Sequence, residues 1–153
     1  MEDLQVATYP GTNLNHARRR ALVADDEPGV RRLLREILGK DYSVLEAENG
    51  REAVEIALRE KPDVILLDVM MPDMDGITAC AAIKRDATTN AIPVVIISAI
   101  TYELNKKMAE KGAGASAYIT KPFHHKDILA VLATLLSAET VSRERNERDT
   151  AGL

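Results

Sequence analysis

The sequence predicts a single α/β domain in which a five-stranded parallel sheet is covered by helices on both faces. Short apolar runs recur along the chain without the polar and apolar alternation of half-exposed strands, and such runs are typical of strands buried on both sides. Amphipathic helical patterns fill the intervals between them. This regular alternation of strands and helices favours a doubly wound fold.

Four of the expected strands are strongly apolar, and a fifth, over residues 42–47, is weaker. The strong ones span residues 21–24, 64–67, 94–97 and 118–120. Pro62 and Pro93 lie at or just before strand starts. A missing amide donor is tolerated there, so both prolines are compatible with these strands.

Five helices are expected, and the first is the best defined because apolar residues follow one helical face. That face carries Val30, Leu33, Leu34, Ile37 and Leu38, opposite Arg31, Arg32, Arg35 and Glu36. The helix is predicted to open at Asp26-Glu27-Pro28 and to stop near Gly39. The other four are expected after Asn49-Gly50, over 76–85, over 102–111 before the Gly112-Ala113-Gly114 breaker, and over about 126–137.

The length of 153 residues, with 46% hydrophobic content, suits one domain with its own core. We expect that domain over residues 18–138. Residues 1–17 are polar and aperiodic, which predicts a flexible N-terminal extension. Residues 139–153 mix acids with arginines and are expected to form a polar C-terminal tail.

Composition also predicts a cytoplasmic protein without membrane insertion. The N-terminal segment has no apolar core of a signal peptide, and the longest apolar stretch, residues 92–100, is too short to span a bilayer. Cys80 is the single cysteine, which is consistent with a reducing compartment. With a net charge of −4, the Arg18-Arg19-Arg20 cluster is interpreted as a solvated lead-in to a strand. Direct nucleic-acid binding is therefore not expected.

Five polar residues follow the predicted strands directly: Asp25, Asp26, Asp68, Ser98 and Lys121. The carboxyl ends of parallel strands lie side by side, so these residues are expected to converge on one crevice. Three crowded carboxylates repel one another. A raised pKa of one carboxyl group or a bound cation reduces this repulsion. Oxygen ligands with open positions suit Mg²⁺.

Each of these residues also has a simpler interpretation when taken singly. Asp25 and Asp26 could be acids at a helix N-terminus, Ser98 a strand-end residue, and Lys121 part of a surface turn. Their conjunction favours a functional site, because a structural protein gains nothing from three carboxylates at one sheet edge. Asp73 and Asp75, between Pro72 and Gly76, are instead expected to be turn and helix-cap residues.

Over residues 20–137 the chain resembles the receiver domain of two-component response regulators, in particular the stand-alone, chemotaxis-regulator-like members. The resemblance rests on Asp25-Asp26-Glu27, on Asp68 to Gly76 with Pro72, on Ser98-Ala99 and on Lys121-Pro122-Phe123. It implies a flavodoxin-like fold with strand order 2-1-3-4-5 and a cis peptide bond at Lys121-Pro122.

The chemistry of the residues and the resemblance agree on a phosphoacceptor. A carboxylate can take up a phosphoryl group when positive charge neutralises the transferring oxygens, so we expect Asp68 to be phosphorylated in a Mg²⁺-dependent reaction. Lys121 and Ser98 would contact phosphoryl oxygens. Asp26 and Asp68 would bind the metal directly and Asp25 through water, and the resemblance adds the Met70 carbonyl.

The implied activity is that of a signalling domain rather than an enzyme with a separate substrate, although the domain would promote its own phosphorylation and dephosphorylation. The donor would be a histidine kinase or a histidine phosphotransfer protein. The resemblance further implies a switch in which Ser98 moves toward the phosphoryl group and Tyr118 rotates inward. A downstream protein would then bind the face made by residues 102–111, 118–120 and 126–137.

Two other functions are compatible with parts of the pattern. A haloacid-dehalogenase-like phosphatase also uses an aspartate after a strand, but it needs a second aspartate two residues on, where this chain has Met70. A receiver that serves only as a binding module would not need the complete site. Phosphorylation by a small donor distinguishes the three.

Overall fold

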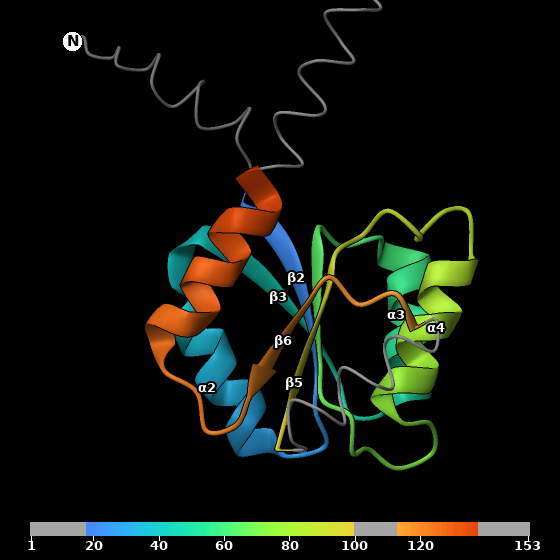
Figure 1. Ribbon diagram of the computed structural model, residues 1–153, viewed down its shortest axis with the longest axis horizontal. Coiled ribbons are helices and arrows are strands. Elements are labelled where there is room, and N and C mark those ends of the chain that lie inside the picture. The colour runs from blue at the N-terminus through green and yellow to red at the C-terminus, as the bar shows by residue number, and fades with distance from the viewer. Residues whose placement is uncertain (1–17, 100–112, 138–153) are drawn as a thin grey trace, which may run out of the picture.

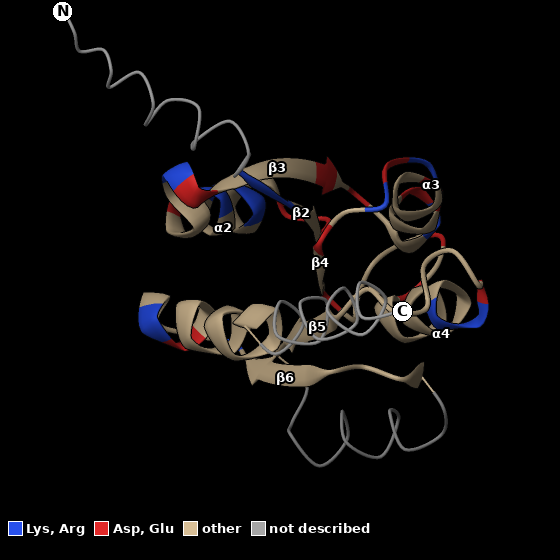
Figure 2. Cartoon of the chain, turned by 90° about the horizontal axis from the view of Figure 1, so that it is seen from above, with Lys and Arg blue, Asp and Glu red and all other residues tan. Residues whose placement is uncertain are grey.

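The computed structural model describes residues 18–99 and 113–137. These residues form a five-stranded parallel sheet. Its strands are β2 (Arg19–Ala24), β3 (Tyr42–Ala47), β4 (Val64–Leu67), β5 (Val94–Ser98) and β6 (Ala117–Thr120). The order across the sheet is β3-β2-β4-β5-β6, which Figure 2 shows from one edge to the other. Numbered along the chain, this is the predicted order 2-1-3-4-5, and the predicted fold is confirmed.

Helices cover both faces of the sheet. α2 (Pro28–Leu38), which continues into the short helix η1 (Gly39–Asp41), lies with the helix over residues 125–137 on one face. α3 (Gly50–Glu60) and α4 (Gly76–Arg85) lie on the other (Figure 1). The predicted helix over 102–111 and the two terminal segments fall outside the described residues. No helix of the described part is long and apolar enough to cross a membrane.

The continuous apolar runs are explained by two cores, one on each side of the sheet. Leu22, Ile65 and Ile96 belong to the core beneath α3 and α4. Val23 and Leu66, their neighbours along the strands, belong to the core beneath α2 and the helix over 125–137. Side chains alternate between the faces of a strand, and here both faces are buried, so the sequence shows no polar alternation.

Side-chain caps begin two of the helices where the sequence predicts them. The Asn49 side chain accepts the Glu52 amide at the start of α3, and the Asp75 side chain accepts the Thr78 amide at the start of α4, both at 2.8 Å. Such caps satisfy amides that have no partner inside the helix. Asp73 has a φ of 71°, so its predicted turn role agrees with the backbone.

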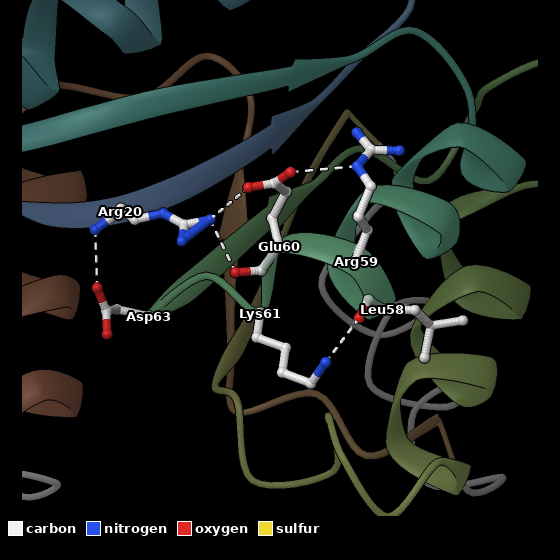
Figure 3. Close-up of polar contacts among 6 residues, drawn as sticks. All are labelled: Arg20, Leu58, Arg59, Glu60, Lys61 and Asp63. Atoms are coloured by element: carbon white, nitrogen blue, oxygen red, sulfur yellow. Dashed lines mark hydrogen bonds and ion pairs between the residues drawn. The ribbon is translucent and has the colours of Figure 1, made fainter.

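Two details differ from the sequence interpretation. Leu33, assigned to the apolar face of α2, is 39% exposed, because the buried stripe of that helix is narrower and runs through Leu34, Ile37 and Leu38. Arg20 is no simple solvated lead-in, since its guanidinium contacts the carbonyl of Glu60 at 2.7 Å and its carboxylate at 2.9 Å (Figure 3). Its own amide donates to Asp63 at 2.7 Å.

Close backbone contacts bring the turn after β4 against neighbouring elements. A Cβ at Gly76 would lie 1.9 Å from the Asp68 carbonyl oxygen, and one at Gly50 would lie 2.1 Å from the Met74 carbonyl oxygen. The Gly50 amide donates to that same Met74 oxygen at 2.9 Å. Only glycine permits these approaches, and the first of them fixes the backbone of Asp68.

We expect Gly76→Ala to lower the free energy of unfolding by about 2–3 kcal/mol, because the new methyl group clashes with main-chain atoms that cannot move independently. Urea denaturation measures this change. Gly29→Ala is the matched control, because no atom lies within 4 Å of the corresponding Cβ. Its stability should be unchanged or higher by up to about 1 kcal/mol. Equal stabilities for the two variants would contradict the steric argument.

Candidate functional site

Three carboxylates meet at the carboxyl edge of the central strands. Asp25 and Asp26 follow β2, Asp68 follows β4, and one carboxylate oxygen from each lies within 4.8 Å of the other two. The strand pairing that places them is direct, since the Asp68 amide donates to the Ala24 carbonyl at 2.9 Å. Asp25 and Asp68 are buried, whereas Asp26 is exposed. The predicted acidic cluster is therefore formed, with one side open to solvent.

Lys121 provides the positive charge of this cluster. Its Nζ donates to Asp25 Oδ2 at 2.8 Å and lies 3.6 Å from Asp68 Oδ1. Glu27, which the sequence analysis did not assign to the site, has Oε1 3.9 Å from the same nitrogen. Lys121 follows β6 and its amide donates to the Ser98 carbonyl at 2.9 Å. The Lys121–Pro122 peptide bond is cis, as predicted.

Asp25 is held on every side. Its amide donates to the Ala47 carbonyl at 3.1 Å, and its Oδ1 accepts the Glu27 amide at 2.9 Å while Oδ2 accepts Lys121. The carbonyl oxygen of Asp25 accepts Nη1 of Arg31 at 2.6 Å. These four bonds fix both the backbone and the side chain of Asp25. Asp25 is therefore a rigid residue of the cluster rather than a mobile ligand.

Burial and neighbouring charges shift the pKa values of two residues in the cluster. Burial, followed by repulsion from Asp25, raises the pKa of Asp68 to about 6, although Lys121 opposes the shift. Burial lowers the pKa of Lys121, but its hydrogen bond to Asp25 and the charge of Asp68 outweigh that effect and raise the pKa overall. One ammonium group therefore does not fully compensate three carboxylates.

The other predicted residues lie on β5, on β6 and in the turn after β4. Ser98 ends β5, is completely buried, and pairs with Thr120 in the sheet register, one residue before Lys121. The Met70 side chain is 67% exposed in the turn after Asp68. Tyr118, on β6, is half-buried and packs against the core beneath α3 and α4. Ser98 and Lys121 therefore share one end of the sheet, with Tyr118 farther along β6.

Residues 21–133 match the response regulator receiver domain. The chain belongs to that family. A receiver domain is a phosphoacceptor signalling module, and the acidic cluster of Asp25, Asp26 and Asp68 is typical of its phosphoacceptor site.

Relatives of known name support this assignment. Response regulator PleD of Caulobacter vibrioides is 40% identical over 134 residues, which cover 87% of this chain but 29% of PleD. Protein PilH of Pseudomonas aeruginosa is 38% identical and is matched over 77% of this chain and 98% of its own length. The receiver domain of sensor histidine kinase PA1611, from the same species, shares the fold with a TM-score of 0.73 at 24% identity, over 79% of this chain and 99% of that one; its structure has a magnesium ion in the active site cleft.

We expect Asp68→Asn to stabilise the metal-free protein above pH 7 by about 2 kcal/mol. In the unfolded chain this carboxyl ionises near pH 4, but in the folded protein it ionises only near pH 6. Its contribution to stability is therefore complete below pH 4 and is lost as pH rises through 6. Urea denaturation in the presence of a chelator, between pH 4 and 8, measures the difference between variant and wild type.

That difference should shrink toward zero near pH 4, where both side chains are uncharged. Glu55→Gln, an exposed change on α3, is the control and should alter stability little at any pH. An Asp68→Asn protein less stable than wild type at pH 7.5 would contradict the proposed repulsion.

Proposed function

We propose that Asp68 is the phosphoacceptor of this receiver domain. One observation carries the assignment: Asp68 is buried at the end of a central strand with the Lys121 ammonium 3.6 Å from one of its oxygens. Asp25 is already bound to Lys121, and Asp26 is exposed. Among the three carboxylates, Asp68 alone combines burial with an oxygen that Lys121 approaches but does not bind.

In the proposed reaction a carboxylate oxygen of Asp68 attacks phosphorus of a phosphohistidine on the donor protein. A new O–P bond forms, the N–P bond breaks, and its electron pair returns to the imidazole nitrogen, which takes up a proton. Transfer of this kind depends on positioning and on neutralising the equatorial oxygens. Lys121 can neutralise one of them, and the Ser98 hydroxyl can donate to another.

The carboxylates fit a hard divalent cation such as Mg²⁺. They offer oxygen ligands within 4.8 Å of one another and one exposed side. Burial and the neighbouring charge of Asp25 raise the pKa of Asp68, and a bound cation would offset both effects. We propose Asp26 and Asp68 as direct ligands, Asp25 as a ligand through water, and the Met70 carbonyl as a further one. When bound, the cation supplies positive charge to phosphoryl oxygens.

The two other candidate functions are less well supported. A phosphatase of the haloacid-dehalogenase type requires an aspartate where Met70 stands, and the Met70 side chain is exposed rather than directed among the carboxylates. A pure binding module would need neither the Lys121 contact nor the crowded carboxylates. The receiver chemistry uses both.

Receiver domains partner with histidine kinases. We propose such a kinase, or a histidine phosphotransfer protein, as the donor here, with the receiver spanning residues 18–138 in the cytoplasm. For output, Tyr118 and the helix over 125–137 form the described part of the proposed partner face, and residues 102–111 lie outside the described residues. A groove of about 290 Å³ between β6 and that helix, lined by Ala117, Val131 and Leu135, belongs to this face.

We expect wild-type protein incubated with Mg²⁺ and a small acyl phosphate to gain the mass of one phosphoryl group. Asp68→Asn should gain none, because the nucleophilic oxygen is replaced by an amide. Intact mass spectrometry gives the result, and circular dichroism checks the fold of each variant. Asp75→Asn is the matched control, because asparagine caps a helix as well as aspartate does, and it should be labelled normally.

Labelling of Asp68→Asn to the wild-type level would overturn the assignment. Continuous release of inorganic phosphate from many small phosphate esters would instead favour the phosphatase. An unmodified wild-type protein under all donor concentrations would favour the binding module.

We expect Ser98→Ala to be phosphorylated at Asp68 yet to transmit little change to the partner face. The hydroxyl is the group that would move toward a phosphoryl oxygen, and a ligand shifts a conformational equilibrium only through differential contacts with the two states. Amide chemical shifts of Tyr118 and of residues 125–137, recorded before and after phosphorylation, measure the response. Equal shift changes in wild type and variant would contradict the coupling.

A further inference from the structure

Arg31 reaches the acidic cluster from α2 by way of the backbone. Its Nη1 donates to the carbonyl oxygen of Asp25 at 2.6 Å, and its side chain is only 11% exposed. Figure 2 shows α2 beside β3, the strand that supplies the second partner of this guanidinium. Arg31 thus links α2 and β3 to Asp25, the first carboxylate of the cluster along the chain.

Glu46 of β3 holds Arg31 in place. Its Oε1 accepts Nε of Arg31 at 2.8 Å, and its Oε2 pairs with the guanidinium of Arg35, one helical turn farther along α2. A guanidinium has a fixed planar fork of donors, so the bond to Glu46 determines where Nη1 points. The carboxylate of Glu46 in turn is fixed by two arginines.

The hydrogen bond from Arg31 to the Asp25 carbonyl matters most for the position of the Asp26 carboxylate. Within the described residues no hydrogen bond holds the Asp26 carboxylate, which is exposed. Its position therefore depends on its backbone. A peptide unit is planar, so fixing the Asp25 carbonyl also fixes the orientation of the Asp26 amide and restricts the direction of its side chain.

We propose that Arg31, oriented by Glu46, is a positioning residue for the cation site, acting through the peptide between Asp25 and Asp26. This inference rests on the proposed function, because it assumes that Asp26 binds Mg²⁺. Arg31 does not touch the cation or the phosphoryl group. It keeps the exposed ligand aligned with the two buried carboxylates before the cation arrives, and so lowers the ordering cost of binding.

An electrostatic role for Arg31 has to be separated from this positioning role. Glu46 offsets only one of the two positive charges of Arg31 and Arg35, so the three side chains together keep one net positive charge. The direct contact is with a carbonyl oxygen rather than with a carboxylate. Arg31→Lys keeps the charge but cannot reach both partners with a planar fork, and it therefore separates the two roles.

The test measures Mg²⁺ affinity by following amide resonances during titration with Mg²⁺ alone. We expect Arg31→Gln to weaken binding about tenfold, the lower end of losses for residues that orient metal ligands. Arg31→Lys should resemble Arg31→Gln, and Arg32→Gln, an exposed change on the same helix, should bind as wild type. The Asp26 amide resonance should already be displaced in metal-free Arg31→Gln.

Glu46→Gln is the second variant, needed in case Arg31→Gln does not fold. It leaves Arg31 present but removes the charge that orients it, and binding should again weaken. Phosphorylation at saturating Mg²⁺ should return to within about threefold of wild type in these variants, because the nucleophile is untouched.

Wild-type affinity in folded Arg31→Gln or Glu46→Gln, or full rescue by Arg31→Lys, would overturn the positioning role. Failure of the wild-type protein to bind Mg²⁺ would refute the proposed cation site itself, which is a separate result.

Discussion

Repulsion among three carboxylates at one sheet edge is the constraint around which the rest of this domain is arranged. Parallel pairing of β2 with β4 brings Asp25 and Asp68 together, and burial makes their repulsion costly. A single ammonium, from Lys121 on the far side of β5, is bound to Asp25 rather than shared equally with Asp68. Burial, together with this imbalance, leaves Asp68 with a pKa near 6 and creates a place where a cation is stabilised.

Rigid packing holds this unfavourable arrangement in place. Gly76 allows α4 to begin against the Asp68 carbonyl, and Gly50 allows α3 to begin against the turn after β4. The central strands are buried on both faces by two separate cores. Local electrostatic strain persists where the surrounding structure determines the geometry, and here both the backbone contacts and the cores do so.

Sequence was sufficient for the strands, most helix starts and the convergence of four charged residues, Asp25, Asp26, Asp68 and Lys121, because each has a local signal. Buried strands are uniformly apolar, helix starts carry caps such as Asn49 and Asp75, and strand ends carry the site. Helical periodicity predicts Arg31 on the charged face of α2, whereas the structure buries most of its side chain between Glu46 and the Asp25 carbonyl. Periodicity identifies a helix face but cannot show that a strand end supplies a partner for it. Leu33 was misplaced because the buried stripe of α2 is narrower than its apolar stripe.

β6 is an edge strand with little burial, which favours the proposed switch there over the centre of the sheet. β4 and β5 are entirely buried and so are four of the six residues of β2, but of β6 only Ile119 is buried. Segments with less burial open at lower free energy than the core. Lys121 follows this strand directly and touches the cluster, so a change in charge at Asp68 acts on an edge strand that is less buried than its neighbour β5. Tyr118 lies on the same strand, packed toward α3 and α4, so the proposed response of its ring requires no movement of the central strands that hold Asp25 and Asp68.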